Sequence, residues 1–399
     1  IILCVQVPSS DGLFQGVTLA DYIDNLFGNV QHKIGDLVNL NDTITFKLWT
    51  YFKGQYSRTY GSAEEEKARI NIFKDNAQFV AISNAQNTFE LALNQFADWT
   101  LEEFDLFKKG LTVPPGIKRF EYQTREYFHK ALRELREHQR STSRRERLKR
   151  KRFFIDWFSG GGSDKNNGGG DKNNGGNKNK LASFDWRDKN VVGSVKNQLK
   201  CGSCYAFASA AVLESLYAIK TGSSVIDLSP QELVDCSGNS GCSGGLFEPT
   251  MDYVISRGGK LATLASYPYV GSKQSCSSGT TVNLGQIKYG AVPVGNETFL
   301  AEALVTYGPM FIGLDAESRA WMFYKSGILT EPSCPNRRRD MDHALLLVGF
   351  GVDSTTNKAY WIIKNSYGTA WGENGYFRLA KDANNMCGIA TMAAYAKLS

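Results

Sequence analysis

The segment from Ser159 to Lys180 consists only of Gly, Asn, Lys, Asp, Ser and contains no hydrophobic side chain. A segment of this composition cannot bury enough apolar surface to offset the entropy lost on ordering it. We therefore expect a flexible linker, with separately folded parts before and after it. The whole chain has 399 residues, of which 42% are hydrophobic, so it has room for two or three domains with buried cores.

The N-terminus and the charge distribution exclude several classes of protein. No run of about 18 apolar residues occurs, so we expect no membrane-spanning helix. We interpret residues 1–16 as a signal-peptide remnant and leader, because the chain opens with the short apolar run Ile1 to Val5. Residues 1–106, 107–180 and 181–399 carry net charges of about −7, +12 and +1. The positive charge lies in the least globular segment, so we expect no nucleic-acid partner.

Residues 107–180 form a basic insert that ends in the Gly/Asn-rich linker. Phe120 to His138 has helix-forming residues with apolar positions near a 3.6-residue period. The basic run from Arg144 to Arg152 has two interpretations. It is either a solvated, self-repelling stretch or a dibasic processing site at its exposed basic pairs.

The acidic N-terminal region contains two predicted helices. One spans Phe46 to Tyr60, and the other follows Ser62, a candidate N-cap, with three glutamates in its first turn. Side chains at steps of three or four residues must share one face of this second helix: Glu65, Arg69, Phe73, Asn76, Val80 and Asn84. Periodicity alone favours an amphipathic surface helix.

The strongest chemical signal after the linker is the sequence Cys201-Gly202-Ser203-Cys204. Two cysteines at this spacing can be half of a zinc site, a redox pair, structural thiols, or a nucleophile beside a disulfide-bonded cysteine. No second Cys-x-x-Cys occurs and the chain has 4 histidines, so we expect no metal site. An Ala-rich helix closed by Lys220 and Gly222 follows, which places Cys204 at a helix N-terminus, where the pKa of a thiol is lowered.

A nucleophilic thiol needs a base and a group that orients the base. His343 opens the apolar run HALLLVGFG, and Asn365 follows the buried-looking run YWII. Taken singly, His343 is equally well interpreted as a structural core histidine and Asn365 as a turn residue. Together with Cys204 they form a candidate catalytic set.

These motifs resemble the papain family of cysteine endopeptidases, in particular its cathepsin L-like branch, in proenzyme form. The similarity covers residues 181–399 and includes SFDWRDKNVV, QLKCGSCYAF, LVDCSGNSGCSGG, MDHALLLVGFG, KNSYGTAWGENGYFRL and MCGIA. It implies an α+β fold with two lobes, a mostly helical one carrying Cys204 and a β-barrel-like one carrying His343 and Asn365. A small helical inhibitory prodomain precedes this papain-like peptidase.

The resemblance also implies the role of each site residue. Cys204 is the nucleophile, His343 the base and acid, Asn365 the orienter of the imidazole, and Gln198 an oxyanion donor beside the Cys204 N–H. A thiolate–imidazolium pair at the helix N-terminus then performs the chemistry without a cofactor. The implied substrate-binding residues are Gly244, Gly245, Leu246, Phe247, Gly313, Met341, Ala344, Tyr367 and Met392.

The residues that resemble the family's S2 pocket are apolar or small, and none is acidic. We therefore predict a hydrophobic or aromatic P2 residue, with Arg disfavoured because its charge would be buried without a partner. No His-bearing insertion occurs between Cys276 and His343. This absence predicts an endopeptidase with a cleft that is open at both ends.

The helix after Ser62 resembles the family's propeptide signature, with Val80 in place of the usual Ile. The segment from Ala92 to Asp98 resembles the motif that follows, with Ala92 replacing Gly and with Asn94, Phe96 and Asp98 retained. We therefore expect residues 17–106 to fold as an inhibitory prodomain that blocks the cleft of residues 181–399. We also expect acid to release it, by protonation of carboxylates such as Glu64, Glu65, Glu66 and Asp98.

Cysteine usage indicates the secretory pathway, with a lysosomal or extracellular destination. By resemblance the disulfides are Cys201–Cys242, Cys236–Cys276 and Cys334–Cys387, while Cys204 stays free and Cys4 lies in the signal remnant. Sequons at Asn41 and Asn296 are compatible with this route. The expected partners are protein and peptide substrates, the chain's own prodomain and cystatin-like inhibitors, and we expect a monomer.

The chain departs from the family pattern at two aromatic positions. Tyr205 follows the nucleophile where Trp is usual, and Tyr367 stands where a Trp normally covers the Asn–His contact. Each tyrosine adds a hydroxyl that needs a partner when it is buried. Two competing hypotheses are a catalytically silent, protease-inhibiting homologue and a thiol transferase or transglutaminase-like enzyme. The first predicts loss of Cys204, His343 or Gln198, and the second does not predict the full motif order Gln, Cys, His, Asn.

Overall fold

The computed structural model describes residues 26–27, 42–112 and 183–399. The signal remnant, the helical pattern from Phe120 to His138, the basic run, the linker and the Asn41 sequon lie outside these residues. The described residues belong to one compact unit. Within them, no helix is both long enough and apolar enough to span a bilayer.

The described residues before the linker form three helices and one short strand: α2 (Asp42–Gln55), α3 (Ala63–Gln86), β1 (Glu90–Leu91) and α4 (Leu101–Lys108). The helices after the linker are η1 (Trp186–Lys189), α7 (Cys204–Thr221), α8 (Pro230–Cys236), α9 (Phe247–Ser256), α10 (Glu297–Tyr307), α11 (Arg319–Met322), η2 (Arg338–Asp340) and η3 (Met386–Gly388). The strands after the linker are β2 (Phe184–Asp185), β3 (Lys260–Ala262), β4 (Thr281–Asn283), β5 (Ile287–Ala291), β6 (Met310–Leu314), β7 (Tyr324–Ser326), β8 (Ile328–Leu329), β9 (His343–Val352), β10 (Ala359–Lys364), β11 (Tyr376–Ala380) and β12 (Met392–Leu398).

The two helices predicted before the linker are confirmed as α2 and α3. Ser62 caps α3 by accepting a hydrogen bond from the Glu65 N–H at 3.1 Å, so the predicted N-cap is also confirmed. Helix α2 packs on α3 through aromatic rings, with the Phe73 ring 5.4 Å from Trp49 and 5.2 Å from Phe52. Burial of these large apolar rings supplies most of the core of this small domain.

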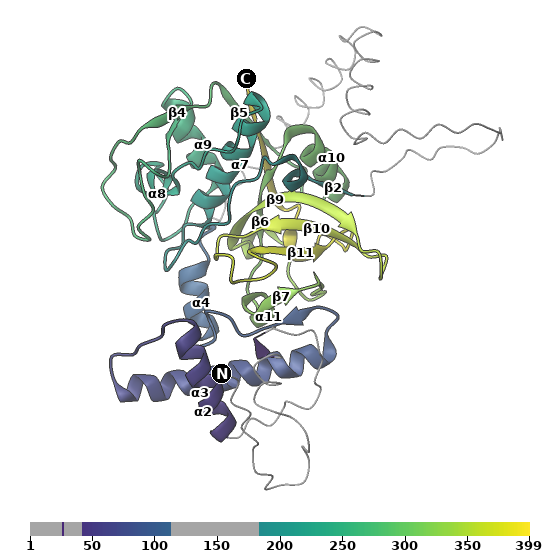
Figure 1. Ribbon diagram of the computed structural model, residues 1–399. Helices are drawn as coiled ribbons and strands as arrows, with labels where there is room; N and C mark the ends of the chain where they lie inside the picture. The colour runs from purple at the N-terminus through teal and green to yellow at the C-terminus, as the bar shows by residue number, and fades with distance from the viewer. Residues whose placement is uncertain (1–25, 28–41, 113–182) are drawn as a thin grey trace, which may run out of the picture. The chain divides into compact units, whose positions relative to one another are not determined.

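The first lobe after the linker is built around α7. This helix has 18 residues, most of them buried, and is the longest helix after the linker. The predicted Ala-rich helix is confirmed, and Gly222 ends it in the left-handed conformation with φ of 65°. Helices α8 and α9 pack against α7, and Figure 1 shows these three helices grouped on one side. Two disulfides, Cys201–Cys242 and Cys236–Cys276, tie the surrounding loops.

The second lobe is an eight-stranded sheet. Seven of its strands follow the order β5-β12-β6-β9-β10-β11-β8, and the eighth, β2, pairs with β9. Strand β9 is buried along nearly its whole length, as its continuous apolar sequence predicts. Strands β9 and β10 are antiparallel neighbours, so the start of β9 and the end of β10 lie at the same edge of the sheet. The predicted α+β fold with a helical and a β-rich lobe is confirmed.

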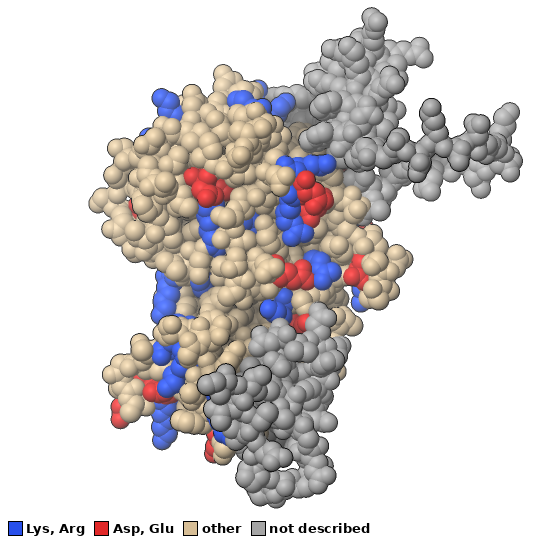
Figure 2. Space-filling view, in the orientation of Figure 1, with Lys and Arg blue, Asp and Glu red and all other residues tan. Residues whose placement is uncertain are grey.

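The exposed surface carries charges of both signs. In Figure 2, acidic and basic side chains are interspersed over the visible face of the described residues. The helical lobe and the sheet instead meet through apolar side chains, including Val212, Leu216, Leu346 and Val348. This apolar contact holds the start of α7 against the edge where β9 begins.

Candidate active site

Cys204 is the first residue of α7, so its thiol lies at the positive end of an 18-residue helix. The side chain is completely buried and is the free cysteine among the described residues. Its Sγ accepts a hydrogen bond from the backbone N–H of Ala344 at 3.3 Å. This contact brings the thiol next to His343, although 140 residues of sequence separate Cys204 from Ala344.

His343 and Asn365 meet because β9 begins where β10 ends. The His343 Nε2 and the Asn365 Oδ1 are 2.9 Å apart, and the Asn365 Oδ1 also accepts from the Ser366 N–H at 2.7 Å. A carboxamide oxygen can only accept, so the Nε2–H donates and the Nδ1 carries the lone pair. This Nδ1 has no hydrogen-bond partner among the described residues. His343 therefore has an unpartnered proton-accepting nitrogen, and the backbone N–H of the next residue, Ala344, contacts the Cys204 thiol.

Gln198 is fully buried at the same site. Its Oε1 accepts from the Ser366 Oγ at 2.7 Å, which fixes the direction of the carboxamide. Its Nε2 donates to the carbonyl oxygens of Cys201, at 3.0 Å, and of Lys108, at 3.2 Å. Lys108 belongs to α4, so a main-chain carbonyl from before the linker lies at the amide group that the sequence predicts to bind an oxyanion.

Tyr367 covers the imidazole. Its ring centroid lies 4.9 Å from that of His343, with 31° between the two planes. The ring of Trp371 packs against Tyr367 in turn, at 5.5 Å. His343 and Asn365 are 0% and 3% exposed, so a tyrosine at this position shields their contact from water in this closed form.

Residues 109–112 run through the cleft beside these groups. The N–H groups of Gly110 and Leu111 both donate to the Asp342 carbonyl, at 3.0 and 2.9 Å. Gly245 donates to the Gly110 carbonyl at 2.9 Å and accepts from the Thr112 N–H at 3.3 Å, which makes a parallel bridge. The chain before the linker therefore occupies the cleft through backbone hydrogen bonds, as an extended peptide would.

Leu111 fills the apolar pocket predicted to bind a P2 side chain. Its side chain is 6% exposed and belongs to the same apolar cluster as Met341, Ala344 and Met392. A Cβ at Gly313 would lie only 2.6 Å from the Leu111 Cδ2, so a side chain there would force Leu111 to shift. Leu246 and Phe247 lie in the same region, and Gly244 faces Thr112. The predicted substrate-binding residues thus come together around residues 110–112.

The occluding segment was missed by the sequence analysis, which ended the prodomain at residue 106. Helix α4 continues to Lys108, and residues 109–112 make the contacts in the cleft. A Cβ on Gly110 would lie 2.1 Å from the carbonyl oxygen of Gly202, beside the nucleophile, so only glycine allows this approach. The lone Gly110 followed by Leu111, directly after a helical pattern, was the signal that could have identified the segment.

Burial controls the protonation of the closed site. It raises the pKa of the Cys204 thiol to about 12 and lowers the pKa of His343 to about 3. Both changes favour the uncharged forms, since desolvation penalises charge. Burial in the closed site therefore favours a neutral thiol and a neutral imidazole, and the ion pair stays a prediction for the open site.

The predicted signature face of α3, from Glu65 to Asn84, holds the chain that follows it. Arg69 makes two hydrogen bonds to the Glu103 carboxylate, at 2.6 and 2.7 Å. Asn76 donates to the carbonyls of Ala97 and Trp99, both at 2.9 Å, and Asn84 bonds both the N–H and the carbonyl of Leu91.

The remaining members of this face are buried or bonded locally. Phe73 and Val80 are fully buried, and Glu65 accepts from the Gly61 N–H at 2.8 Å. The face is a docking surface inside the prodomain, rather than a solvent-exposed amphipathic surface.

The second motif fastens the prodomain to the peptidase. Asn94 donates to the Met322 carbonyl at 2.9 Å, and the Phe96 ring lies 5.9 Å from that of Tyr367. Strand β1 pairs with β7 in antiparallel fashion, and Figure 1 shows the two strands together. The inhibitory domain is therefore anchored outside the cleft as well as in it.

The carboxylates expected to release the prodomain in acid fall into two groups. Hydrogen bonds from Lys53 and Arg69 lower the pKa of Glu66 and of Glu103, respectively. Burial raises the pKa of Asp98, even though Arg58 lies nearby. Protonation of Asp98 therefore does not favour release, contrary to the expectation for this residue. The lowered pKa of Glu66 is consistent with the expected release in acid, and Glu103, which was not among the expected carboxylates, is shifted in the same direction.

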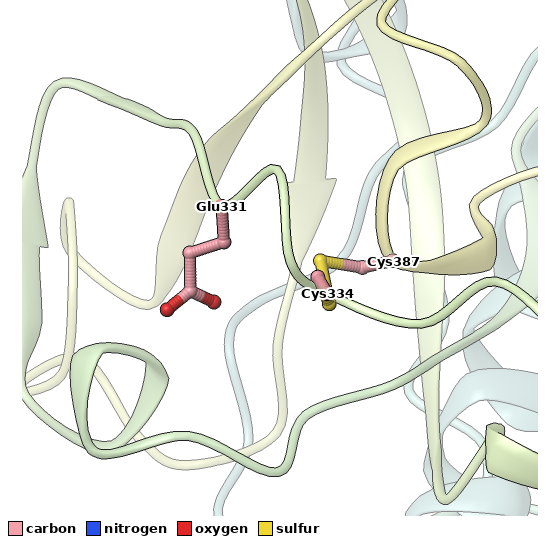
Figure 3. Close-up of side chains that lie close together, drawn as sticks. All are labelled: Glu331, Cys334 and Cys387. Carbon is pink, nitrogen blue, oxygen red and sulfur yellow. A yellow bond between two sulfur atoms is a disulfide. The ribbon is translucent and has the colours of Figure 1, made fainter.

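Two groups of acidic and sulfur side chains among the described residues have the proximity of metal ligands. Figure 3 shows Glu331 on the loop that leads to Cys334, and Cys334 is bonded to Cys387. A disulfide offers no thiolate to a metal. In the other group, of Asp315, Glu317 and Asp342, the Lys109 ammonium lies 2.8 Å from Asp342 and supplies the positive charge. We assign no metal to either group.

The three disulfides join the cysteines that the resemblance implied: Cys201–Cys242, Cys236–Cys276 and Cys334–Cys387. The Tyr205 hydroxyl donates to the Gly241 carbonyl at 3.1 Å, so this departure from the family pattern finds its partner within the peptidase. Asn296, the first residue of the second sequon, is also the N-cap of α10, because its Oδ1 accepts a hydrogen bond from the Phe299 N–H at 2.8 Å.

Comparisons with known proteins agree with this arrangement. Residues 181–397 match the papain family cysteine proteases, and residues 49–104 match the cathepsin propeptide inhibitor domain. Digestive cysteine proteinase 1 of Homarus americanus is 33% identical over 357 residues, which are 87% of this chain and 93% of that protein. Cathepsin L1 of Drosophila melanogaster is 32% identical over 361 residues, 88% of this chain and 85% of that protein.

Solved structures of proenzymes are also similar. The structure of digestive procathepsin L2 proteinase from Tenebrio molitor larval midgut has a TM-score of 0.68 and 30% identity, and covers 89% of this chain and 100% of that chain. The recombinant stem bromelain precursor has a TM-score of 0.68 and 31% identity, with 89% and 99% covered. Both similarities include the prodomain as well as the peptidase.

Proposed function

This chain belongs to the papain family of cysteine proteases and carries a cathepsin propeptide inhibitor domain, and from this premise we propose that it hydrolyses peptide bonds through Cys204 and His343. The observation that carries the proposal is the His343 imidazole: its Nε2 is bonded to Asn365, its Nδ1 has no partner among the described residues, and the N–H of the next residue contacts the Cys204 thiol. In the processed enzyme, water enters the cleft and the helix N-terminus favours a thiolate, which allows the thiolate–imidazolium pair.

Each residue has one role in the proposed reaction. The Cys204 sulfur attacks the peptide carbonyl, His343 donates its proton to the leaving amine, and Asn365 holds the imidazole in one tautomer. Gln198 and the Cys204 N–H donate to the oxyanion that forms on attack. Water then hydrolyses the thioester, with His343 as the base. Peptide-bond hydrolysis by this route needs no cofactor.

The proposed specificity is for a hydrophobic P2 residue in the interior of a protein chain. The pocket that holds Leu111 supports this preference, because an Arg side chain there would lose its hydration without gaining a partner. We propose that cystatin-like proteins inhibit the open cleft, that the enzyme acts as a monomer, and that it works in lysosomes or outside the cell. Three disulfides in the described residues support a secretory route.

We propose that residues 17–106 and the following segment to Thr112 form the inhibitory part, that residues 113–180 are a tether, and that the peptidase begins near Leu181. Maturation then has two steps. A cut in the basic run severs the tether, and acid dissociates the prodomain. N-terminal sequencing of the active form tests the boundary, and a start far from residue 181 would contradict it.

Labelling and turnover test the proposed reaction together. After acid treatment, the full-length chain should hydrolyse a fluorogenic peptide with Leu or Phe at P2 and should be labelled at Cys204 by a peptidyl epoxide. The Cys204→Ala variant is the matched control and should do neither. Labelling without turnover would indicate a catalytically silent homologue, and acyl transfer to amines without hydrolysis would indicate a transferase. A peptide library in which Arg exceeds Leu and Phe at P2 would refute the specificity.

A further inference from the structure

The Tyr367 hydroxyl lies inside the active site without a role in the reaction described above. Tyr367 is fully buried, and its ring covers His343. In the family that the chain resembles, this position is usually Trp. An indole has its single donor on the five-membered ring, whereas tyrosine places an O–H at the far end of a longer axis. The hydroxyl is therefore a group that this chain adds to the site.

The hydroxyl and the Gln198 amide converge on one oxygen atom. The Tyr367 O–H donates to the Lys108 carbonyl oxygen at 3.1 Å, and the Gln198 Nε2 donates to the same oxygen at 3.2 Å. Burial raises the pKa of Tyr367 well above its ordinary value, so the phenol keeps its proton and acts as a donor. Two side chains thus form a binding site for a carbonyl oxygen next to the nucleophile.

The acceptor for Tyr367 leaves when the prodomain leaves. The other tyrosine that replaces a usual Trp, Tyr205, donates to Gly241 within the peptidase and keeps that bond after processing. Lys108 instead belongs to α4, which precedes the linker. Loss of Lys108 also removes Phe96 and Phe104, whose rings pack against Tyr367, so water reaches the hydroxyl in the processed enzyme. A bound substrate carbonyl can then take the position that the Lys108 oxygen held between the Tyr367 and Gln198 donors.

We propose that, in the processed enzyme, the Tyr367 hydroxyl is an oxyanion donor that acts beside Gln198. The inference rests on the proposed function and deepens it. As the Cys204 sulfur bonds to the carbonyl carbon, the carbonyl π electrons move to oxygen, and the O–H of Tyr367 and the N–H of Gln198 both donate to the negative charge. Tyr367 loses no proton. When the intermediate collapses, the carbonyl re-forms, the C–N bond breaks and the amine takes its proton from His343.

Such a donor stabilises the transition state more than the bound substrate, because the oxygen becomes charged only on attack. Removing it should lower kcat and leave KM nearly unchanged. Tyr367→Phe keeps the ring over His343 and deletes only the hydroxyl. We expect kcat for a fluorogenic peptide to fall on the order of 10²-fold, the size typical for loss of one oxyanion donor.

The experiment compares hydrolysis with alkylation in one set of enzymes. Full-length wild type, Tyr367→Phe and Tyr289→Phe are processed with an aspartic protease that is then inhibited, and working sites are counted with a peptidyl epoxide. Tyr289 bonds Asp252 on the surface, so Tyr289→Phe controls for the loss of a tyrosine hydroxyl and should retain wild-type kcat. Iodoacetamide alkylates the thiol at a saturated carbon and forms no oxyanion. Its rate should therefore stay within about twofold of wild type in Tyr367→Phe, because the thiol and imidazole are unchanged.

Three results would overturn the inference. An unchanged kcat would mean that the hydroxyl takes no part. A raised KM with unchanged kcat would show that it binds only the ground-state substrate. An equal loss in alkylation would show that Tyr367 acts by positioning His343. If the wild type itself fails to hydrolyse peptides, the proposed function fails instead, and the two failures are thereby distinguished.

Discussion

Replacing Glu103 with Gln should weaken the inhibitory domain and raise the pH at which the proenzyme activates. Glu103 accepts two hydrogen bonds from Arg69, at 2.6 and 2.7 Å, and joins the N-terminal half of α3 to the start of α4. It also completes a capping box with Thr100 at the start of α4. Glutamine can serve the capping box, so this substitution mainly removes the charge and one acceptor oxygen from the pair with Arg69.

The size of the effect follows from the geometry and the exposure. Hydrogen bonds to charged groups contribute about 1.5–3 kcal/mol each. The Arg69 and Glu103 side chains are 23% and 32% exposed, so solvent screens part of that energy. With one bond retained by glutamine, we expect a loss of about 2 kcal/mol, which raises the unfolded fraction of the prodomain about 30-fold.

The pH dependence has a definite sign. The hydrogen bond from Arg69 lowers the pKa of Glu103, so the pair stabilises the folded prodomain above the ordinary carboxyl pKa of about 4.3. That contribution is lost as the pH falls through the lowered pKa. Wild-type activation should therefore begin below about pH 4.5. Glu103→Gln lacks this contribution at every pH, so its activation should begin at higher pH and vary less steeply.

The assay follows peptide hydrolysis by the full-length proenzyme after incubation from about pH 3.5, one unit below the expected wild-type transition, up to about pH 7, where the variant is expected to differ most from the wild type. Melting of the same variants in a Cys204→Ala background gives stability without self-digestion. Glu64→Gln, at an exposed glutamate of α3, is the matched control and should follow the wild type. An Arg69→Met, Glu103→Gln double variant should be little worse than either single one. Wild-type melting and activation in Glu103→Gln would refute the reasoning.

Three further predictions concern the cleft, the basic run and the core. Leu111→Arg places an unpaired charge in an apolar pocket, so uncleaved proenzyme should show raised peptide hydrolysis at neutral pH. An unchanged background rate of hydrolysis would mean that the Leu111 side chain adds nothing to inhibition. Replacing residues 149–152 with alanine should slow activation by a trypsin-like protease at neutral pH and leave acid activation intact. If the variant and the wild type were activated at equal rates under both conditions, the basic run would be a spacer only. Tyr205→Phe leaves the Gly241 carbonyl without its donor and should cost about 1–3 kcal/mol in unfolding free energy, measured by denaturant titration; full stability would show that water replaces the hydroxyl.

Local patterns were sufficient to place the reactive groups on their elements. Cys204 begins a helix because an Ala-rich stretch follows it, and His343 begins a strand because a continuous apolar run follows it. Ser62 marks a helix start through the ordinary chemistry of an N-cap. These predictions depend on neighbours within a few residues, which is why they could be made without the fold.

The end of the prodomain could not be located in the same way. A boundary at residue 106 follows from the motif and the charge change, yet α4 ends at Lys108 and residues 110–112 bond to Gly245 and Asp342. Apart from the lone Gly110 after a helical pattern, the local sequence does not distinguish a segment that lies in a cleft from one that lies in solvent. The distinction depends on partners more than 130 residues away.

Residue types and short motifs were enough to predict the catalytic groups and an apolar S2 pocket, and the resemblance supplied the disulfide partners. The protonation of the closed site, the opposite pKa changes of Asp98 and Glu103, and the partner of the Tyr367 hydroxyl depend on the tertiary structure. A pKa depends on how much water the fold removes from a group and on which charges it brings near. The Tyr367–Lys108 contact joins residues 259 positions apart. Their meeting is a consequence of how the prodomain docks, which no local pattern encodes.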